Sequence, residues 1–150
     1  MTQKQAAYFT FWHTLLASAR QHTSRHADIS PGKQNRIAAS AGLRGLKFEY
    51  ALGRHDASVA LLINRSSGKE NNALFDALLK EKEAIEAAFG APLTWDRQNK
   101  HKICRIKAHI EQDEPLDETV WPALQETMIQ AMILLETVMQ PHLQTLASRS

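Results

Sequence analysis

The strictest pattern in this chain is an alternation of side chains over residues 46–52. Every second residue there is a large apolar one, namely Leu46, Phe48, Tyr50 and Leu52. A period of two is that of a β-strand that buries one face, because successive side chains point to opposite sides of a sheet. The pattern predicts a strand, and it limits the chain to folds that contain a sheet.

Two further strands follow from similar arguments. Residues 59–63 are continuously apolar, which is typical of a central strand covered on both faces. The link between them and residues 46–52 is short, which favours an antiparallel hairpin. Residues 104–110 alternate again, and the alternation places Cys104 on the buried side, where a thiol is inert.

The rest of the chain gives helical patterns and two weaker strand signals. Apolar residues that recur at three- and four-residue steps indicate helices with one buried face. The predicted elements, in order, are a helix over 4–21, strands over 37–43, 46–52 and 59–63, a helix over 71–89, a strand over 93–97, a turn at 98–100, a strand over 104–110 and a helix from Thr119 onward.

This order predicts a single α+β domain over residues 1–150. Its five-stranded sheet should be mixed or antiparallel and packed by the helices, because the loops are short and the elements share one apolar pattern.

The two terminal helices carry apolar stripes. In the first helix the stripe includes Phe9 and Trp12. In the last helix, methionines at helical spacing indicate either core packing or the interface of a homodimer. Pro141 is expected to kink or end that helix. The methionines are Met128, Met132 and Met139.

The composition favours a reducing compartment, and the charged residues are unevenly distributed along the chain. The single cysteine excludes an internal disulfide, and the chain contains neither a signal-peptide pattern nor an apolar run long enough to cross a bilayer. We therefore expect a cytoplasmic protein without a membrane partner. Residues 1–70 contain ten lysines and arginines against four acidic residues, whereas residues 111–150 contain one against seven. Such asymmetry suits either a polyanion-binding face or internal charge matching.

Candidate binding residues come from the polar segment 30–36 and from the polar faces of two strands. Lysine and arginine on a sheet face, with amides nearby, suit a phosphate backbone or a partner protein. For Asn35 the alternative is a structural role, since turn amides often bind nearby backbone. The candidate contact residues are Lys33, Gln34, Asn35, Arg36, Lys47, Arg105 and Lys107.

The sequence favours a non-catalytic role, with no catalytic residue, metal ligand or cofactor assigned. Ser58 lies near His55 and Asp56, but Ser and Asp are ordinary turn residues. A glycine-rich phosphate loop is also missing from the sequence.

The order helix, three strands, helix, strand resembles the core of the PD-(D/E)xK nucleases. Those enzymes place carboxylates on the second and third strands to hold a divalent metal. Here the second strand offers only Glu49, which we interpret as a surface charge beside Lys47, and residues 59–64 offer no carboxylate. The resemblance therefore implies, at most, a degenerate nuclease-like core.

A second resemblance covers most of the chain, from Phe11-Trp12 to the last helix. The chain resembles domain-of-unknown-function family 4268, a bacterial family often found at the carboxyl end of restriction-like or nuclease-like proteins. It departs from the family pattern at Arg36, where an aromatic residue is usual, and at Ala60, where an acidic one is. The residues that carry the resemblance are Lys33-Gln34-Asn35, Ile37, Phe75-Asp76, Leu78, Lys82, Ile85-Glu86, Phe89-Gly90, Pro92-Leu93, Trp95 and Arg105-Ile106.

The family resemblance implies a context and no mechanism. With the basic strand face, it favours a non-catalytic accessory module of a bacterial DNA-processing or defence system that contacts nucleic acid or a partner. The alternative is a homodimeric interaction module that uses the methionine-rich helix. A metal-dependent nuclease is the weakest of the three hypotheses.

Overall fold

The fold is built on one five-stranded sheet with the spatial order β1-β2-β3-β5-β4. All neighbouring strands in it are antiparallel, which confirms the α+β prediction and selects the antiparallel arrangement from the two that were expected. The computed structural model describes residues 1–97 and 102–148, so the predicted turn at 98–100 lies outside the described residues. The strands are β1 (Arg36–Ser40), β2 (Leu46–Leu52), β3 (Asp56–Ile63), β4 (Thr94–Asp96) and β5 (Cys104–Glu111).

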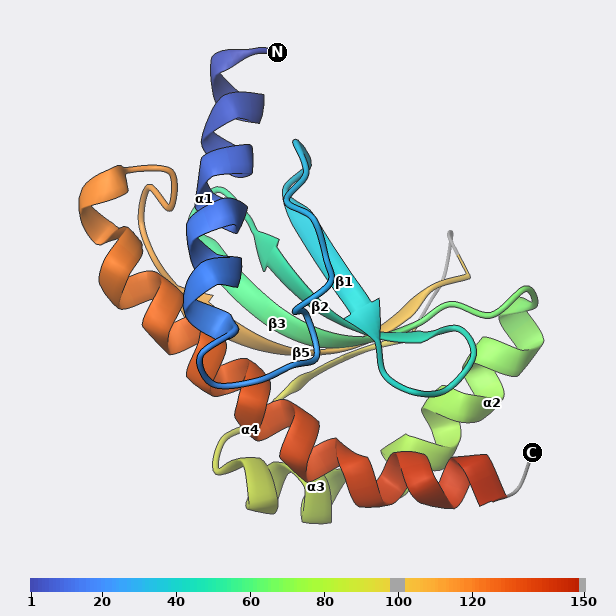
Figure 1. Cartoon of the computed structure of the whole chain (residues 1–150). Coiled ribbons are helices and arrows are strands. Elements are labelled where there is room, and N and C mark those ends of the chain that lie inside the picture. The colour runs from blue at the N-terminus through green and yellow to red at the C-terminus, as the bar shows by residue number, and fades with distance from the viewer. Residues whose placement is uncertain (98–101, 149–150) are drawn as a thin grey trace.

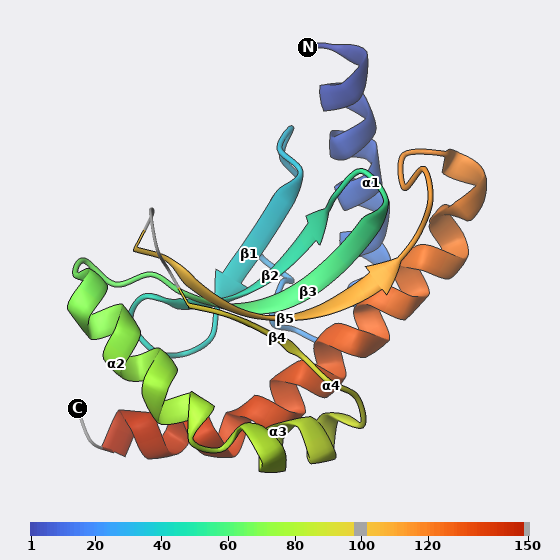
Figure 2. The same cartoon turned by 180° about the vertical axis from the view of Figure 1, so that it is seen from behind.

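Helices cover one side of this sheet and leave the other side open (Figure 1 and Figure 2). The longest helix, α4, runs across β2, β3 and β5, and both α1 and α3 pack against it. Among the described residues, none of the helices combines the length and the apolar character needed to span a bilayer. The helices are α1 (Gln3–Ala19), α2 (Gly68–Leu79), α3 (Lys82–Phe89), the short 3-10 helix η1 (Glu118–Val120) and α4 (Trp121–Ser148).

The strand register explains the alternation in the sequence. Phe48 of β2 lies opposite Leu61 of β3, which in turn lies opposite Ile106 of β5. All three side chains are buried under the helices. Cys104, two residues before Ile106 on the same face of β5, is buried as well. The predicted one-sided strands and the buried thiol are therefore confirmed.

The strand predicted over residues 59–63 is longer in the structure, because β3 begins at Asp56. Its extra residues pair with both neighbouring strands, and Asp56 itself lies opposite Glu111 of β5. Backbone pairing thus continues past the apolar run that marked the strand in the sequence. The third strand consequently does carry a carboxylate, at its first position.

The single helix predicted over residues 71–89 is wrong, since the chain forms two helices there. Ser67 caps α2 by accepting a hydrogen bond from the Glu70 N–H, so this helix also begins earlier than expected. The break falls at Lys80–Glu81 because the two helices pack against different surfaces. Phe75 of α2 packs edge-on against Trp95 under the sheet, whereas α3 packs against α4.

Pro141 neither ends nor visibly interrupts α4, which continues to Ser148. Proline in a helix interior removes one hydrogen bond and typically costs about 3 kcal/mol. Leu143 and Leu146, beyond the proline, are buried in the core. Their packing offsets the local cost and keeps the last turns helical.

The apolar stripe of α1 includes Trp12 but not Phe9, whose side chain is 41% exposed. The buried face is centred on Phe11 and Trp12, and the Trp12 indole N–H donates a hydrogen bond of 2.7 Å to the Gln34 carbonyl. Phe9 lies on the outer side and stacks with His13. Because aromatic residues follow one another closely in this helix, the sequence pattern did not show which of them face the core.

The methionine stripe of α4 belongs to the core, with Met128, Met132 and Met139 fully buried. We predict that Met132→Ala lowers the free energy of unfolding by about 2–5 kcal/mol, because it leaves a cavity among well-packed neighbours. Urea unfolding measures the change. Leu134→Ala, on the outer side of the same helix, should cost less than about 1 kcal/mol, and equal costs would contradict this packing.

A buried polar cluster fastens the loop between α1 and β1 to the sheet. His26 is 1% exposed, and its Nε2 lies 3.1 Å from the Phe48 carbonyl oxygen, to which it donates. Arg25 of the same loop pairs with Glu136 of α4 at 3.3 Å. Burial lowers the pKa of His26, while it raises the pKa of Tyr50 beside it and that of Glu136.

Because the folded-state pKa of His26 lies below its ordinary value of 6.5, the unfolded chain binds the proton more readily. His26 therefore adds stability above pH 6.5 that is lost as the pH falls through its folded-state pKa, at no more than about 1.4 kcal/mol per pH unit. Glu136 acts in the opposite direction, because its pKa is raised. We predict that the stability gap between the wild type and His26→Gln shrinks from pH 7.5 to 5.5. A constant gap in denaturant unfolding would contradict this.

Candidate functional site

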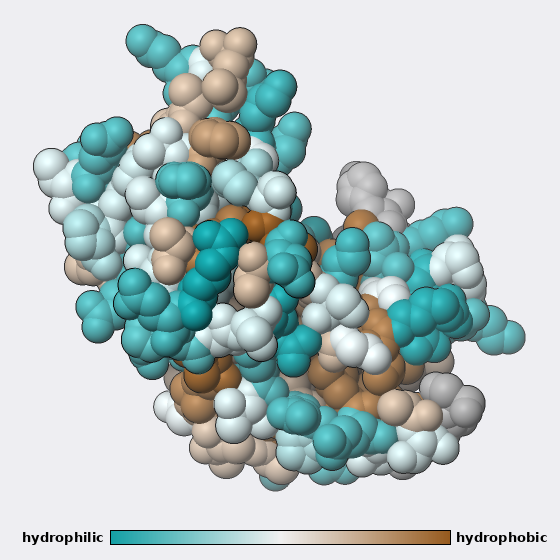
Figure 3. All heavy atoms as spheres, viewed as in Figure 1, coloured by the Kyte–Doolittle hydropathy of each residue, from teal (hydrophilic) through white to brown (hydrophobic). Residues whose placement is uncertain are grey.

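The open side of the sheet, called the free face below, presents the residues that alternate with the core positions. Figure 3 shows the opposite side of the molecule, on which α1 and α4 lie, and its surface is mostly hydrophilic with hydrophobic atoms in small areas. From the strand register, the free face consists of Arg36, Ala38, Ser40, Lys47, Glu49, Ala51, Asp56, Ser58, Ala60, Leu62, Thr94, Asp96, Arg105, Lys107, His109 and Glu111.

Small side chains form the centre of the free face. Ala38 and Ala60 lie on either side of Glu49, on β1 and β3, and Ala51 lies opposite Ser58. A methyl group projects little from a sheet, so long side chains from the neighbouring strands can lie across these positions. The sequence order hid this arrangement, because the residues come from three strands.

Glu49 is the centre of an ion-pair network on the free face. Its Oε1 accepts a hydrogen bond of 2.9 Å from Nη1 of Arg36 and one of 3.1 Å from Nε of Arg105. The Glu49 side chain is only 6% exposed, whereas that of Arg36 is 41% exposed. The interpretation of Glu49 as a surface charge beside Lys47 is therefore wrong. The small residues on its flanks let two arginines from opposite strands reach and bury it.

The structure brings together four of the seven predicted contact residues. Arg36 and Arg105 meet at Glu49, and Lys107 occupies the same cross-strand row as Glu49, with Ala60 between them. Lys47 lies one pair further along β2 and is exposed. Four cations thus lie on this part of the free face, and two of them pair with one carboxylate.

The other three predicted residues lie at the entrance to β1, away from this network. The Asn35 side-chain N–H donates to the Leu52 carbonyl at 3.0 Å, and the Asn35 carbonyl accepts from the Leu52 N–H at 2.9 Å. Asn35 thus has the structural role that was one of the two alternatives. Gln34 contributes its backbone carbonyl to Trp12, and Lys33 is exposed.

The opposite end of the free face is acidic and contains the Ser58 region. His109 Nδ1 lies 3.0 Å from Asp56 Oδ2, and Ser58 lies opposite His109 across the strands. His55, by contrast, faces Asp113 at 3.8 Å. The neighbours in sequence therefore do not form a joint site. Within residues 1–97 and 102–148, no group of three or more histidine, cysteine, aspartate or glutamate side chains is placed to hold a metal ion.

Fold and free face together define an α+β domain whose antiparallel sheet is covered on one side and polar on the other. A family model for a domain of unknown function, DUF4268, matches residues 7–143. The chain therefore belongs to this family, which confirms the resemblance found in the sequence. No curated protein and no solved structure matches the chain.

We predict that Glu49→Gln lowers the free energy of unfolding by about 1–3 kcal/mol, because two partly buried guanidinium groups lose their charged partner. Glu111→Gln, on the same face but exposed, is the matched control and should change stability by less than about 0.5 kcal/mol. Adding Glu49→Gln to Arg105→Gln should cost less than the sum of the single changes. Additive costs in urea unfolding would show that the network does not act as a unit.

Proposed function

We propose that this chain is a non-catalytic accessory module of a bacterial DNA-processing or defence system, and that its free face contacts the phosphate backbone of nucleic acid. The observation that carries the proposal is the grouping of Arg36, Lys47, Arg105 and Lys107 around a carboxylate that is already neutralised. The rest of the context comes from the family resemblance.

Glu49 would orient the two guanidinium groups for this contact. A guanidinium carries five N–H donors, and each arginine directs one of them to Glu49. The remaining donors suit phosphate oxygens, which guanidinium groups bind in a forked geometry. Lys47 and Lys107 add mobile point charges beside them.

The chemistry of the free face favours backbone contact over base recognition. Its described residues include no phenylalanine, tyrosine or tryptophan, the side chains on which unpaired bases stack. Phosphate contacts position a protein without reading sequence. The proposed binding is therefore independent of sequence and sensitive to salt.

The competing hypothesis, a homodimer through the methionine-rich helix, has less to support it. The methionines of α4 face the core, so such an interface would have to use the outer side of the helix, where Leu134 is 39% exposed. Light scattering of the purified chain separates the two hypotheses, because the free face requires no second copy.

We predict that the chain binds labelled duplex DNA or RNA at low salt, and that Lys47→Ala and Lys107→Ala each weaken binding. Each removed phosphate contact should reduce the slope of log K against log salt by about 0.9 for duplex DNA. Fluorescence anisotropy titrations at several salt concentrations measure affinity and slope together. These lysines lie outside the Glu49 hydrogen bonds, so the variants should fold normally.

The control is Lys80→Ala, which removes the same charge from an exposed position between α2 and α3. It should leave affinity and slope unchanged. Absence of binding at low salt would refute the proposal. An equal loss of affinity in the Lys80 variant would show that binding depends on net charge and not on the free face.

A further inference from the structure

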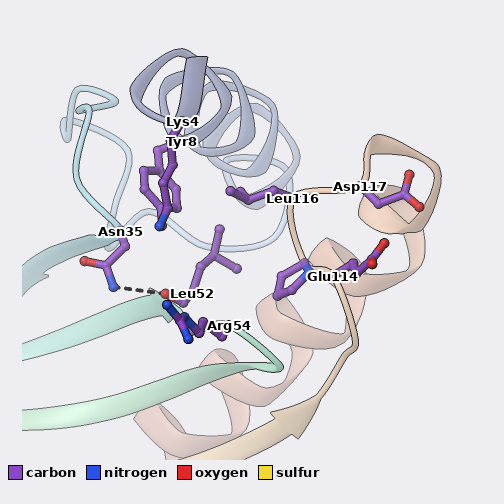
Figure 4. Close-up of a pocket in the computed structure, with 10 residues that line it drawn as sticks. Lys4, Tyr8, Asn35, Leu52, Arg54, Glu114, Leu116 and Asp117 are labelled. Atoms are coloured by element: carbon purple, nitrogen blue, oxygen red, sulfur yellow. Dashed lines mark hydrogen bonds between the residues drawn. The ribbon is translucent and has the colours of Figure 1, made fainter. Parts of the chain in front are cut away.

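A pocket of about 600 Å³ lies beside the sheet, at the end where β1 begins and β2 ends. It is separate from the Glu49 network, although Asn35, which lines it, directly precedes Arg36 of the free face. Its volume falls within the range of about 300–1,000 Å³ that is usual for small-molecule sites. Four segments distant in sequence form it, and its lining residues are drawn in Figure 4.

Hydrogen bonds hold the pocket walls in place. Asn35 ties the entrance of β1 to Leu52, as described above. On the other wall, the Trp121 indole N–H donates to the Pro115 carbonyl at 2.9 Å, and Asp117 accepts from the backbone and hydroxyl of Thr119. Hydrogen bonds thus tie down the parts of the wall that Asn35 and residues 115–117 form.

Its lining combines an apolar floor with cations at the rim. Leu52 and Leu116 approach each other across the cavity, and the side chains of Lys4 and Tyr8 extend from α1 toward Leu52 (Figure 4). The Lys4 ammonium group lies 6.0 Å from the centre of the Tyr8 ring. Arg54 follows on the turn after β2.

The two acidic residues of the lining do not neutralise these cations. The Glu114 and Asp117 carboxylates point away from the leucines (Figure 4). Asp117 is also engaged by the Thr119 N–H and hydroxyl, and these hydrogen bonds lower its pKa. The pocket therefore offers positive charge at its rim beside an apolar floor.

We propose that this pocket binds a nucleotide through its terminal phosphate monoester. Lys4 and Arg54 hold the phosphate from the two sides, as a point charge and a forked donor. The base lies on the apolar surface of Tyr8, Leu52 and Leu116. The ligand is either a free nucleotide or the phosphorylated end of a strand. This inference does not rest on the proposed function of the free face.

Calorimetric titration with AMP and with adenosine tests the proposal. We expect AMP to bind at least about tenfold more tightly than adenosine, since charge-assisted hydrogen bonds to the phosphate are the stronger contacts. Lys4→Ala and Arg54→Ala should each weaken AMP binding by about tenfold. Both residues are exposed, so neither change threatens the fold. Lys80→Ala and Lys107→Ala should leave AMP binding unchanged.

Absence of AMP binding, equal affinity for adenosine, or an equal effect of the control variants would overturn the inference.

A second titration identifies the source of the nucleotide, with short duplexes that differ only in a 5′-phosphate. Tighter binding of the phosphorylated duplex, lost in Arg54→Ala, assigns the pocket to strand ends. Equal binding of both duplexes together with AMP binding assigns it to free nucleotides. Lys107→Ala is expected to weaken nucleic-acid binding by the free face and to leave AMP binding unchanged. It therefore separates a failure of the proposed function from a failure of this inference.

Discussion

The structure depends on the two-sided pairing of β3. This strand pairs with β2 along one edge and β5 along the other, and it is the strand most extensively covered by α4. Val59, Leu61 and Ile63 point into the helices, while Ser58, Ala60 and Leu62 face the open side and are nevertheless buried. Burial on both faces explains why the sequence of β3 is continuously apolar, although helices cover only one of them. The long side chains of neighbouring strands shield the other.

That shielding decides the chemistry of the free face. A larger residue at position 60 would stand between Glu49 and the strand from which Arg105 reaches it. The alanines are thus as necessary to the network as its charged members. A search for charged residues alone would identify the arginines, but it would miss the small residues that let them converge on one carboxylate.

The sequence predicted the architecture well where local pattern and tertiary environment agree. Alternation identified β2 and β5, placed Cys104 in the core and put Arg105 and Lys107 on one face. Predictions failed where tertiary packing overrides local preference, as in the helix that continues through Pro141 and in the division between α2 and α3. The burial of Glu49 could not be predicted, because it depends on which strands are neighbours, and no spacing along the chain encodes that order. The pocket around Leu52 and Leu116 was missed for the same reason, since its walls come from four distant segments.

The position of Glu49 also affects how the free face can hold an anion. A bare group of cations must first lose water and counterions, whereas Arg36 and Arg105 already share an internal anion. In the proposed contact, an incoming phosphate would therefore share the two arginines with a carboxylate that is covalently part of the same surface. It would bind beside this permanent anion and would not replace it. Such sharing would favour weak, rapidly reversible association along a polyanion over tight capture at one point.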